Sequence, residues 1–243
     1  MNIAVIFAGG VGSRMKSKKA KPKQFLEMYG KPIIIYTLEK FEENNLIDAI
    51  VISCLKEWIG YLEELIAKYG LKKVKKIVEG GKNGQESIYN GLNAANELAG
   101  REKSIVLIHD GVRPFIDSET ITANIESVRK YGSAITTVPV VETIMIVSDN
   151  NKIEYIPNRN KSRLARAPQS FWLDEILEVH KKSLRLGLSN FIDSCTMMQY
   201  FGKEMYLVDG PEENIKITTP SDFYTMRALL DAKENAQIYG YEE

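Results

Sequence analysis

The chain opens with Asn2-Ile3-Ala4-Val5-Ile6-Phe7-Ala8, an apolar run that ends abruptly at Gly9-Gly10. A short apolar run of this kind is typical of a central parallel strand that is covered on both faces. The glycines after it let backbone N–H groups approach a ligand closely, and consecutive amides in a turn form an anion-binding nest. This stretch therefore predicts a buried strand with a ligand-binding turn at its carboxyl end.

A basic segment follows the turn and contains Gly12, Arg14 and Lys23. Its positive side chains are Arg14, Lys16, Lys18, Lys19, Lys21 and Lys23. The segment suits a polyphosphate, whose several negative charges need more than one cation. Pro22 restricts the backbone beside Lys23 and so favours a lysine aimed at a ligand. The alternative is a tight turn followed by a solvated basic loop.

Composition and motif searches exclude several classes of function. Lysine and arginine total 32 and so do aspartate and glutamate, so no overall positive charge points to nucleic acid. A Walker A loop is absent, and Met15 stands where a dinucleotide fingerprint needs its third glycine. The two cysteines have no metal-ligand spacing and fit a reducing compartment. No stretch approaches the roughly 20 apolar residues of a membrane span. We expect a cytoplasmic protein without nucleic-acid or membrane partners.

Strand and helix patterns alternate through the first part of the chain. The later strands are expected at Ala49–Cys54, Val74–Val78, Ser104–Ile108 and Ala134–Val138. Right-handed crossovers then predict an α/β fold, a Rossmann-like and mostly parallel sheet with helices on both faces. Ligands bind beyond the carboxyl ends of such strands. Gly9-Gly10, Gly80-Gly81 and His109-Asp110 follow three of the strands and should meet at one edge of the sheet.

The alternation breaks at about 141–166, where a β-hairpin is predicted as an insertion into one nucleotide-binding domain that spans 1–243. Thr143–Val147 and Lys152–Ile156 are its expected strands. Its isoleucines are too many for a free arm, so we expect the arm to pack on a second subunit in a homodimer. Beyond it, Ala167–Phe171 is interpreted as a returning connection. The remaining expected elements are helices near Leu173–Leu186, from about Asp193 and from Pro220, with short strands at Tyr206–Val208 and Asn214–Ile217.

Several polar side chains near the strand ends are candidates for chemistry. Asp110 could hold Mg²⁺ together with phosphate oxygens, or could pair with Arg113 to order a loop. Lys216, between two isoleucines, either faces a phosphate site or is a solvated charge. His109 is interpreted as a structural hydrogen-bonding residue, and His180 as a helix surface residue without a role. Ser87 could contact a nucleotide base, but an ordinary helix start is the simpler interpretation.

Taken together, the motifs resemble the cytidylyltransferase family that makes CDP-activated polyols. The resemblance covers almost the whole chain. It depends on Ala8–Met15, Pro22–Phe25, Gly80-Gly81 with Ser87, His109-Asp110 with Arg113-Pro114, Asn158–Asn160, Pro168–Phe171 and Asn214–Lys216, in this order. Each motif alone is weak, but the ordered set is specific. The resemblance implies a Rossmann-like nucleotidyltransferase in which a polyol phosphate attacks the α-phosphorus of CTP and pyrophosphate leaves, with Mg²⁺ as the cofactor.

The resemblance also implies roles for individual residues. It implies catalytic roles for Arg14, Lys23 and Lys216 and a Mg²⁺-binding role for Asp110. It implies nucleotide binding by Ala8, Gly9, Gly10, Gly12, Gly81, Lys82 and Ser87. It implies substrate binding by Arg113, and by Thr143 and Arg159 reaching across a dimer interface.

Two branches of the family differ in the acceptor. Five stretches resemble the ribitol-5-phosphate branch more than the 2-C-methyl-D-erythritol 4-phosphate branch of isoprenoid biosynthesis, namely Ala8–Gly10, Thr37–Phe41, Lys56–Trp58, Val112–Phe115 and Asp193–Cys195. The chain departs from the family at Gly84, where an arginine is frequent, and at Ala167, where threonine is common. A sugar-1-phosphate nucleotidyltransferase that uses UTP or dTTP, and a nucleotide binder without turnover, are the alternatives.

Overall fold

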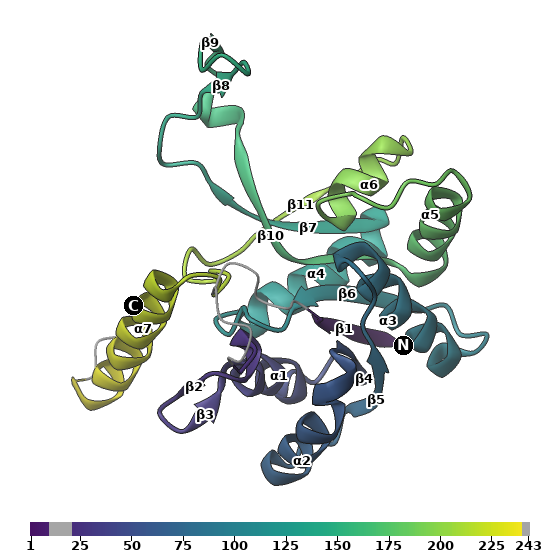
Figure 1. Ribbon diagram of the computed structural model, residues 1–243, viewed down its shortest axis with the longest axis vertical. Helices are drawn as coiled ribbons and strands as arrows, with labels where there is room; N and C mark the ends of the chain where they lie inside the picture. The colour runs from purple at the N-terminus through teal and green to yellow at the C-terminus, as the bar shows by residue number, and fades with distance from the viewer. Residues whose placement is uncertain (10–20, 240–243) are drawn as a thin grey trace.

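A seven-stranded sheet lies at the centre of the computed structural model, which describes residues 1–9 and 21–239 (Figure 1). Its strand order is β11-β7-β10-β6-β1-β4-β5. The strands are β1 (Asn2–Ala8), β4 (Ala49–Cys54), β5 (Val74–Glu79), β6 (Ile105–Asp110), β7 (Ser133–Pro139), β10 (Arg163–Trp172) and β11 (Leu207–Asp209). Only β10 runs antiparallel to its two neighbours, β6 and β7, whereas the other pairings are parallel. The predicted mostly parallel sheet is therefore confirmed.

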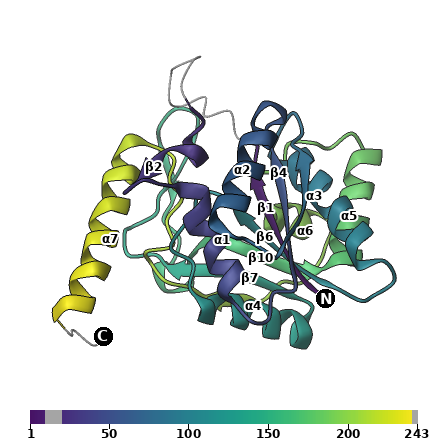
Figure 2. The same cartoon turned by 90° about the horizontal axis from the view of Figure 1, so that it is seen from below.

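Helices cover both faces of this sheet, as predicted (Figure 2). One face carries α1 (Ile33–Glu43), α2 (Ile59–Tyr69) and α4 (Ser118–Tyr131), and the other carries α3 (Gly84–Ala99), α5 (Leu173–Arg185) and α6 (Ser194–Tyr200). The alternation of side chains along β1 explains the two cores, because Ala4 and Ile6 face the first set of helices while Ile3 and Val5 face the second. An apolar run without polar positions thus fits a strand covered on both faces.

A third, smaller core lies between the last helix and the segment that follows residue 21. The last helix, α7 (Pro220–Tyr239), packs near the small antiparallel pair of β2 (Glu27–Met28) and β3 (Lys31–Pro32), and both views place α7 beside β2 (Figures 1 and 2). Met226 is fully buried there against Met28 and Phe115. Asp222 caps the start of α7, because its Oδ2 accepts hydrogen bonds from the backbone N–H groups of Thr218 and Thr219.

The interpretation of Ala167–Phe171 as a connection was wrong, because these residues belong to the buried half of β10. Phe171 is paired with Val106 on one side and with Ser133 on the other. The misleading residue is Pro168, which cannot donate a hydrogen bond to a sheet. The sheet accommodates it at an irregularity, since the register with β7 shifts between Ala165 and Gln169.

The strand predicted at Asn214–Ile217 was also wrong. This segment is extended but belongs to none of the sheets. It is held by individual hydrogen bonds across the carboxyl end of the main sheet instead. The N–H of Ile217 donates to the carbonyl oxygen of Val112 at 2.9 Å, and Asn214 Nδ2 donates to the carbonyl oxygen of Ala167 at 2.7 Å. These bonds connect the loop after β6 to β10 by way of this segment.

The predicted hairpin is present and projects from the body of the molecule between β7 and β10 (Figure 1). Its strands are shorter than predicted, β8 being Ile146–Val147 and β9 Ile153–Tyr155. Apolar side chains of the arm are exposed, namely Val141, Met145, Ile146, Val147, Ile153, Tyr155, Ile156 and Leu164. The remaining short helices are η2 (Lys23–Phe25), η3 (Lys56–Trp58) and η4 (Arg159–Lys161). In the part of the chain described, no helix is long and apolar enough to cross a membrane.

Helix α3 approaches the sheet closely at Gly91, and this contact generates a stability prediction. A Cβ atom at Gly91 would lie 2.6 Å from Val5 Cγ1 and 2.9 Å from Ser53 Oγ, both in the sheet. We expect Gly91→Ala to lower the free energy of unfolding by about 1–3 kcal/mol through overpacking. Gly60→Ala in α2 is the matched control, because its Cβ meets nothing within 4 Å. That control should stabilise the fold by about 0.4–1 kcal/mol. Urea unfolding measures both, and equal effects would contradict the packing argument.

Candidate active site

The carboxyl ends of β1 and β5 meet at a cluster of glycines around Ser87. A Cβ on Gly9 would lie 3.0 Å from Ser87 Oγ, and one on Gly80 would lie 3.4 Å from the Cα of Gly9. Ser87 Oγ accepts a hydrogen bond from the N–H of Gly81 at 2.9 Å and donates one to the carbonyl oxygen of Asn83. The glycines are thus required by close approach of two backbones. Residues 80–84 are held as a rigid rim over the end of the sheet.

Lys23 reaches the same edge because its neighbours fix the η2 turn. Gln24 is buried, and its Nε2 donates to the carbonyl oxygen of Ala8 at 2.6 Å. Phe25 is also buried and stacks on Trp58 with ring centroids 5.0 Å apart. Lys21 points away from the site, to Glu27 at 2.8 Å. The basic segment therefore does not act as one solvated block, because its described lysines have different surroundings.

A first cavity of about 200 Å³ joins the predicted nucleotide-binding residues. It is lined by Ala8, Gly9, Lys23, Gln24, Gly81, Lys82, Asn83, Gly84, Ser87, Asp110, Val112 and Lys216, with Phe7 at its base. All the predicted nucleotide-binding and metal-binding residues that the structure describes are in this set, together with Lys23 and Lys216. Gly10, Gly12 and Arg14 lie outside the described residues. The convergence expected at one edge of the sheet is therefore present for the described part of the site.

A cluster of charges is centred on Asp110, in which Asp110 and Arg113 are buried and Lys216 is partly exposed. Asp110 Oδ2 accepts a hydrogen bond from Arg113 Nε at 2.8 Å, and Asp110 Oδ1 lies 2.5 Å from Lys216 Nζ. Arg113 Nη1 donates to the carbonyl oxygen of Asn214 at 2.9 Å. Lys216 Nζ also lies over the ring of Phe7, 5.6 Å from its centroid. One carboxylate thus holds two cations and connects the end of β6 to the 214–217 segment.

The charges around Asp110 keep it ionised in spite of its burial. Burial alone raises the pKa of a carboxyl group, but the positive charges of Lys216 and Arg113 lower the pKa of Asp110 to about 2. Its folded-state pKa lies below the value of about 3.9 for an unfolded chain. The stability that it contributes is therefore present above pH 4 and is lost as the pH falls from about 4 towards 2. At neutral pH Asp110 is a fixed negative charge.

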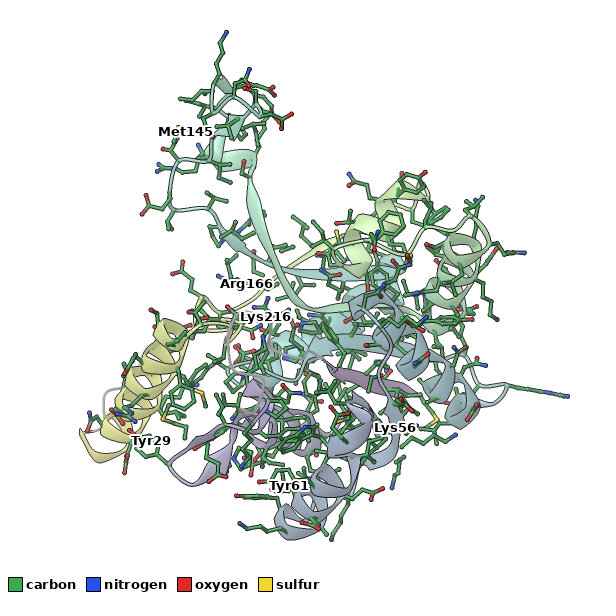
Figure 3. The ribbon with its side chains drawn as sticks, in the orientation of Figure 1. Tyr29, Lys56, Tyr61, Met145, Arg166 and Lys216 are labelled. Atoms are coloured by element: carbon green, nitrogen blue, oxygen red, sulfur yellow. The ribbon has the colours of Figure 1, made fainter. Side chains whose placement is uncertain are left out.

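A second cavity, of about 350 Å³, adjoins the first and shares Asp110 and Lys216 with it. Its lining also contains Arg113 and Arg166. Figure 3 labels Arg166 and Lys216 at the base of the arm, near the middle of the molecule. The other polar residues that line the second cavity are Gln85, Gln169, His180, Asp193 and Ser194. The two cavities therefore adjoin at Asp110 and Lys216. From there the second cavity passes Arg113 and Arg166 and extends between α3, α5 and α6.

The interpretation of His180 as a surface residue was wrong. His180 is 1% exposed and stacks on Tyr89 with ring centroids 5.6 Å apart. Neither ring nitrogen has a hydrogen-bond partner in the described structure, and burial lowers the pKa of His180 to about 4. The flanking Glu178 and Lys181 suggested a solvated face. The spacing of His180 from Leu173, Ile176 and Leu177, which places it on the apolar face of α5, was the available signal.

The position of His109 agrees with its interpretation as a structural hydrogen-bonding residue. It is fully buried, packs edge-on against Phe41, and its Nε2 lies 3.1 Å from the carbonyl oxygen of Arg113. Burial lowers the pKa of His109 to about 4, so the ring is neutral at physiological pH. His109 therefore positions the loop that carries Arg113, and it is not poised as a general base.

The two predicted arm residues lie apart from both cavities of the same protomer. Thr143 and Arg159 are exposed, and Arg159 Nη1 donates to the carbonyl oxygen of Val141 within the arm. Neither is among the described residues that line the two cavities. If these side chains bind substrate, they do so in a neighbouring molecule.

Carboxylates for a metal site are sparse. Among residues 1–9 and 21–239, no three His, Cys, Asp or Glu side chains are grouped in a way that could hold a metal ion. Asp110 is the acidic residue that both cavities share. Magnesium in nucleotide-transfer sites is often held by one or two carboxylates and completed by phosphate oxygens and water. The donor set therefore fits an ion that arrives with a nucleotide, and does not fit a metal held by protein ligands alone.

A family model described as 2-C-methyl-D-erythritol 4-phosphate cytidylyltransferase, or IspD, matches residues 2–232. The chain belongs to this family. The chain is 52% identical over 240 residues to a ribitol-5-phosphate cytidylyltransferase of Streptococcus agalactiae serotype V, which covers 99% of each chain. It is 41% identical over 231 residues to a 2-C-methyl-D-erythritol 4-phosphate cytidylyltransferase of Clostridium acetobutylicum, covering 95% of this chain and 97% of the relative.

The fold agrees with solved structures of the IspD family. A crystal structure of 4-diphosphocytidyl-2C-methyl-D-erythritol synthase from Anaerococcus prevotii superposes with a TM-score of 0.82 at 28% identity, covering 95% of this chain and 96% of that one. The predicted family, fold class and class of enzyme, a nucleotidyltransferase, are therefore confirmed.

The burial of His180 predicts how stability depends on pH. Its folded-state pKa of about 4 lies below the unfolded value of roughly 6.5, so the unfolded chain binds the proton more tightly between these values. Stability should therefore fall as the pH drops through 6.5 towards 4. His180→Phe keeps the stack on Tyr89 and removes the titration. Its loss of unfolding free energy from pH 7.5 to pH 5, measured by urea unfolding, should be about 1–2 kcal/mol smaller than that of the unaltered protein. An equal loss would mean that His180 is accessible to protons in the folded state.

Proposed function

We propose that this IspD-family protein transfers CMP from CTP to D-ribitol 5-phosphate, which yields CDP-ribitol and pyrophosphate. The choice of ribitol 5-phosphate as the acceptor depends on the difference in sequence identity between this chain and relatives of the two branches. The relative named for ribitol 5-phosphate is 52% identical over 99% of each chain, whereas the relative named for 2-C-methyl-D-erythritol 4-phosphate is 41% identical. The five stretches that resemble the ribitol branch support the same choice. Methylerythritol phosphate is the second candidate, because the family model carries its name.

The two adjoining cavities suggest how the reactants meet. The triphosphate would lie against Gly9, Gly81 and Lys23 in the first cavity, and the acceptor would enter the second. Their junction is at Lys216 and Asp110, which line both. A phosphate oxygen of the acceptor forms a bond to the α-phosphorus of CTP while the bond to pyrophosphate breaks. The incoming phosphate is itself ionised, so no general base is required. This fits a site beside which both histidines, His109 next to Asp110 and His180 in the lining of the second cavity, are buried and have pKa values lowered to about 4.

Positive side chains would supply the catalysis. Charge accumulates on the α-phosphate in the transition state, and positioned cations stabilise it. We assign this role to Lys23, to Lys216 and to Arg14, which lies outside the described residues. Lys216 is well suited to it because Asp110 holds its ammonium group at the junction of the cavities. Removing one such group typically costs about 10²–10³ in rate.

A divalent cation, Mg²⁺ in our proposal, would be held by Asp110 and by phosphate oxygens of CTP. It would neutralise charge on the triphosphate as pyrophosphate leaves. Asp110 is ionised at neutral pH and lines the nucleotide cavity, as this role requires. Binding of the cation would compete with the ion pair between Asp110 and Lys216, and would free Lys216 to turn towards a phosphate.

We further propose that the molecule is a homodimer and that the arm at 141–166 completes the neighbour's active site. Apolar arm residues such as Val147 and Ile153 are half exposed, which is unfavourable unless another surface covers them. Arg159 is on this arm, outside both cavities of its own protomer. A dimer of single-domain chains would bring it to the acceptor phosphate of the partner. The cytoplasmic location expected from the sequence is supported by Cys54 and Cys195, which are free thiols.

Pyrophosphate release with defined reactants tests the function. With CTP, ribitol 5-phosphate should give a kcat/KM at least 10-fold above that of 2-C-methyl-D-erythritol 4-phosphate, a difference of about 1.4 kcal/mol in transition-state binding. UTP should replace CTP poorly. Faster turnover of the erythritol phosphate would assign the protein to the other branch. A UTP or dTTP preference would point to a sugar-phosphate enzyme, and CTP binding without any turnover would point to a regulatory nucleotide binder.

Mixing two inactive variants tests whether the arm acts across a dimer. Lys216→Ala removes a cation from the body, and Arg159→Ala removes one from the arm, so each homodimer should be impaired in every site. Random reassortment makes about half the dimers hybrids, each with one intact site, and should restore about a quarter of wild-type activity. The control is a chain that carries both Arg159→Ala and Lys216→Ala. Mixing this chain with either single variant should restore no activity, because no hybrid dimer then contains an intact site. No recovery, with hybrids verified by mass spectrometry, would contradict a shared site.

A further inference from the structure

Arg166, on β10, is a cation that neither the sequence motifs nor the roles above include. It lines the second cavity, next to the junction where Lys216 and Asp110 lie (Figure 3). Its Nε–H group is buried and makes no hydrogen bond in the described structure. No carboxylate of the described residues lies within ion-pair distance of it. Burying a charged donor without a partner is costly, so such a group marks a place where a ligand is expected.

The surroundings of Arg166 strengthen the requirement for an anion. The pKa of the Arg166 guanidinium is lowered, first by burial and then by the positive charge of Arg113, although Glu212 offsets part of this. An arginine stays protonated in spite of such shifts. Two guanidinium groups therefore face a common space while repelling each other. An anion between them relieves the repulsion and supplies the missing hydrogen-bond acceptors.

Arg113, the residue that the family resemblance suggests for substrate binding, is already engaged. Its Nε donates to Asp110 and its Nη1 donates to the carbonyl oxygen of Asn214. These bonds use two of the five N–H donors of Arg113, hold the 214–217 segment in place and fix the Arg113 guanidinium against Asp110. Arg166 has no such commitments, and its planar group presents several donors that match phosphate oxygens.

The charges at the junction favour an anion. Arg113, Arg166 and Lys216 are positive there and Asp110 is negative, while Glu212 offsets part of the charge of Arg166 and Asp193 lies further along the lining of the second cavity. A phosphate monoester carries about −1.5 to −2 near pH 7. Such a group would offset the excess of positive charge, whereas an uncharged polyol would leave it in place.

We propose that Arg166 binds the phosphate of the acceptor from within the same protomer, in addition to the arm residue Arg159 of a neighbouring molecule, and makes the enzyme specific for phosphorylated polyols. This inference rests on the proposed function for the identity of the acceptor. The phosphate would lie at the cationic mouth of the second cavity, beside Lys216, where its oxygen faces the nucleotide cavity. The carbon chain would extend inwards between α3, α5 and α6. Arg166 would then touch the reacting group directly and fix its position.

Direct binding of ribitol 5-phosphate to the full chain, measured by calorimetry without CTP, tests this role separately from turnover. Arg166→Gln removes the charge and the Nε–H group at similar length. A charge-assisted hydrogen bond is usually strong enough that its loss should weaken binding by about 10-fold or more. Arg166→Lys keeps the charge but loses the planar arrangement of donors. Its affinity for ribitol 5-phosphate should lie between those of the unaltered protein and Arg166→Gln. Inorganic phosphate should compete with ribitol 5-phosphate in the unaltered protein and compete more weakly in Arg166→Gln.

Arg163→Gln is the matched control. Arg163 lies on the same strand, is exposed, and pairs with Asp209 at 3.2 Å, away from the described lining of both cavities. Its affinity for ribitol 5-phosphate should stay within about 2-fold of the unaltered protein. In turnover assays, Arg166→Gln should raise the KM for the acceptor and leave the KM for CTP unchanged.

Equal affinities of Arg166→Gln and Arg163→Gln would overturn the inference, as would an equal rise in both KM values or no binding of ribitol 5-phosphate to the unaltered protein. Thermal unfolding of each variant separates these results from loss of the fold. If the unaltered protein binds ribitol 5-phosphate through Arg166 but transfers no CMP to it, the proposed function fails while the phosphate-binding role of Arg166 stands.

Discussion

The ion cluster of Asp110, Arg113 and Lys216 is the constraint on which the site depends. Lys216 and Arg113 come from segments far apart in the chain, and both are held by one buried carboxylate. Removing one partner of such a cluster leaves an uncompensated buried charge and typically costs 3–5 kcal/mol in other proteins, whereas the intact cluster is close to neutral in energy. The cluster is therefore better understood as a positioning device than as a source of stability. It brings the 214–217 segment, which has no place in the sheet, to the end of β6.

The other elements of the fold bring further residues to the edge of the sheet where this ion cluster lies. Parallel strands end at one edge, and β1, β5 and β6 bring Gly9, the 80–84 segment and Asp110 to that edge. Gly9 and Gly80 let these two strand ends approach within contact of Ser87. At Gly84 the position that a Cβ would take is open, and Gly84 lines both cavities. The replacement of the family's frequent arginine by glycine therefore leaves space at the point where the cavities adjoin.

Sequence reasoning succeeded where a local pattern was decisive and failed where tertiary context prevailed. Asn2–Ala8 was predicted with its observed bounds because an unbroken apolar run has few alternatives in an α/β chain. Ala167–Phe171 was misjudged because Pro168 is a poor strand residue, and only the pairing on both sides makes it part of β10. The strand expected at Asn214–Ile217 follows the local pattern, but no neighbouring strand is there to pair with it. The inward position of His180 was indicated by its spacing from Leu173, Ile176 and Leu177, but the flanking charged residues were given more weight.

Arg166 was missed for a different reason. In the segment Arg163-Leu164-Ala165-Arg166, two arginines have the same local context, and only the structure distinguishes the exposed one, paired with Asp209, from the one at the cavity.

The states of the ionisable groups support the proposal that this site works through charge and not through proton transfer. Both histidines of the chain are buried, and burial lowers their pKa values to about 4, so neither is protonated at neutral pH. A hydroxyl nucleophile would need a base that accepts a proton. Among the described lining of the two cavities, Asp110 is kept ionised at a pKa of about 2 and is a weak base, Asp193 accepts hydrogen bonds from Gln169 and Thr196, and His180 is buried with its pKa lowered to about 4. A phosphate nucleophile needs only to be brought close to another phosphate against their mutual repulsion. That repulsion is what several cations around one carboxylate are suited to overcome, so the protonation states of the site select the chemical class of acceptor before its carbon skeleton is considered.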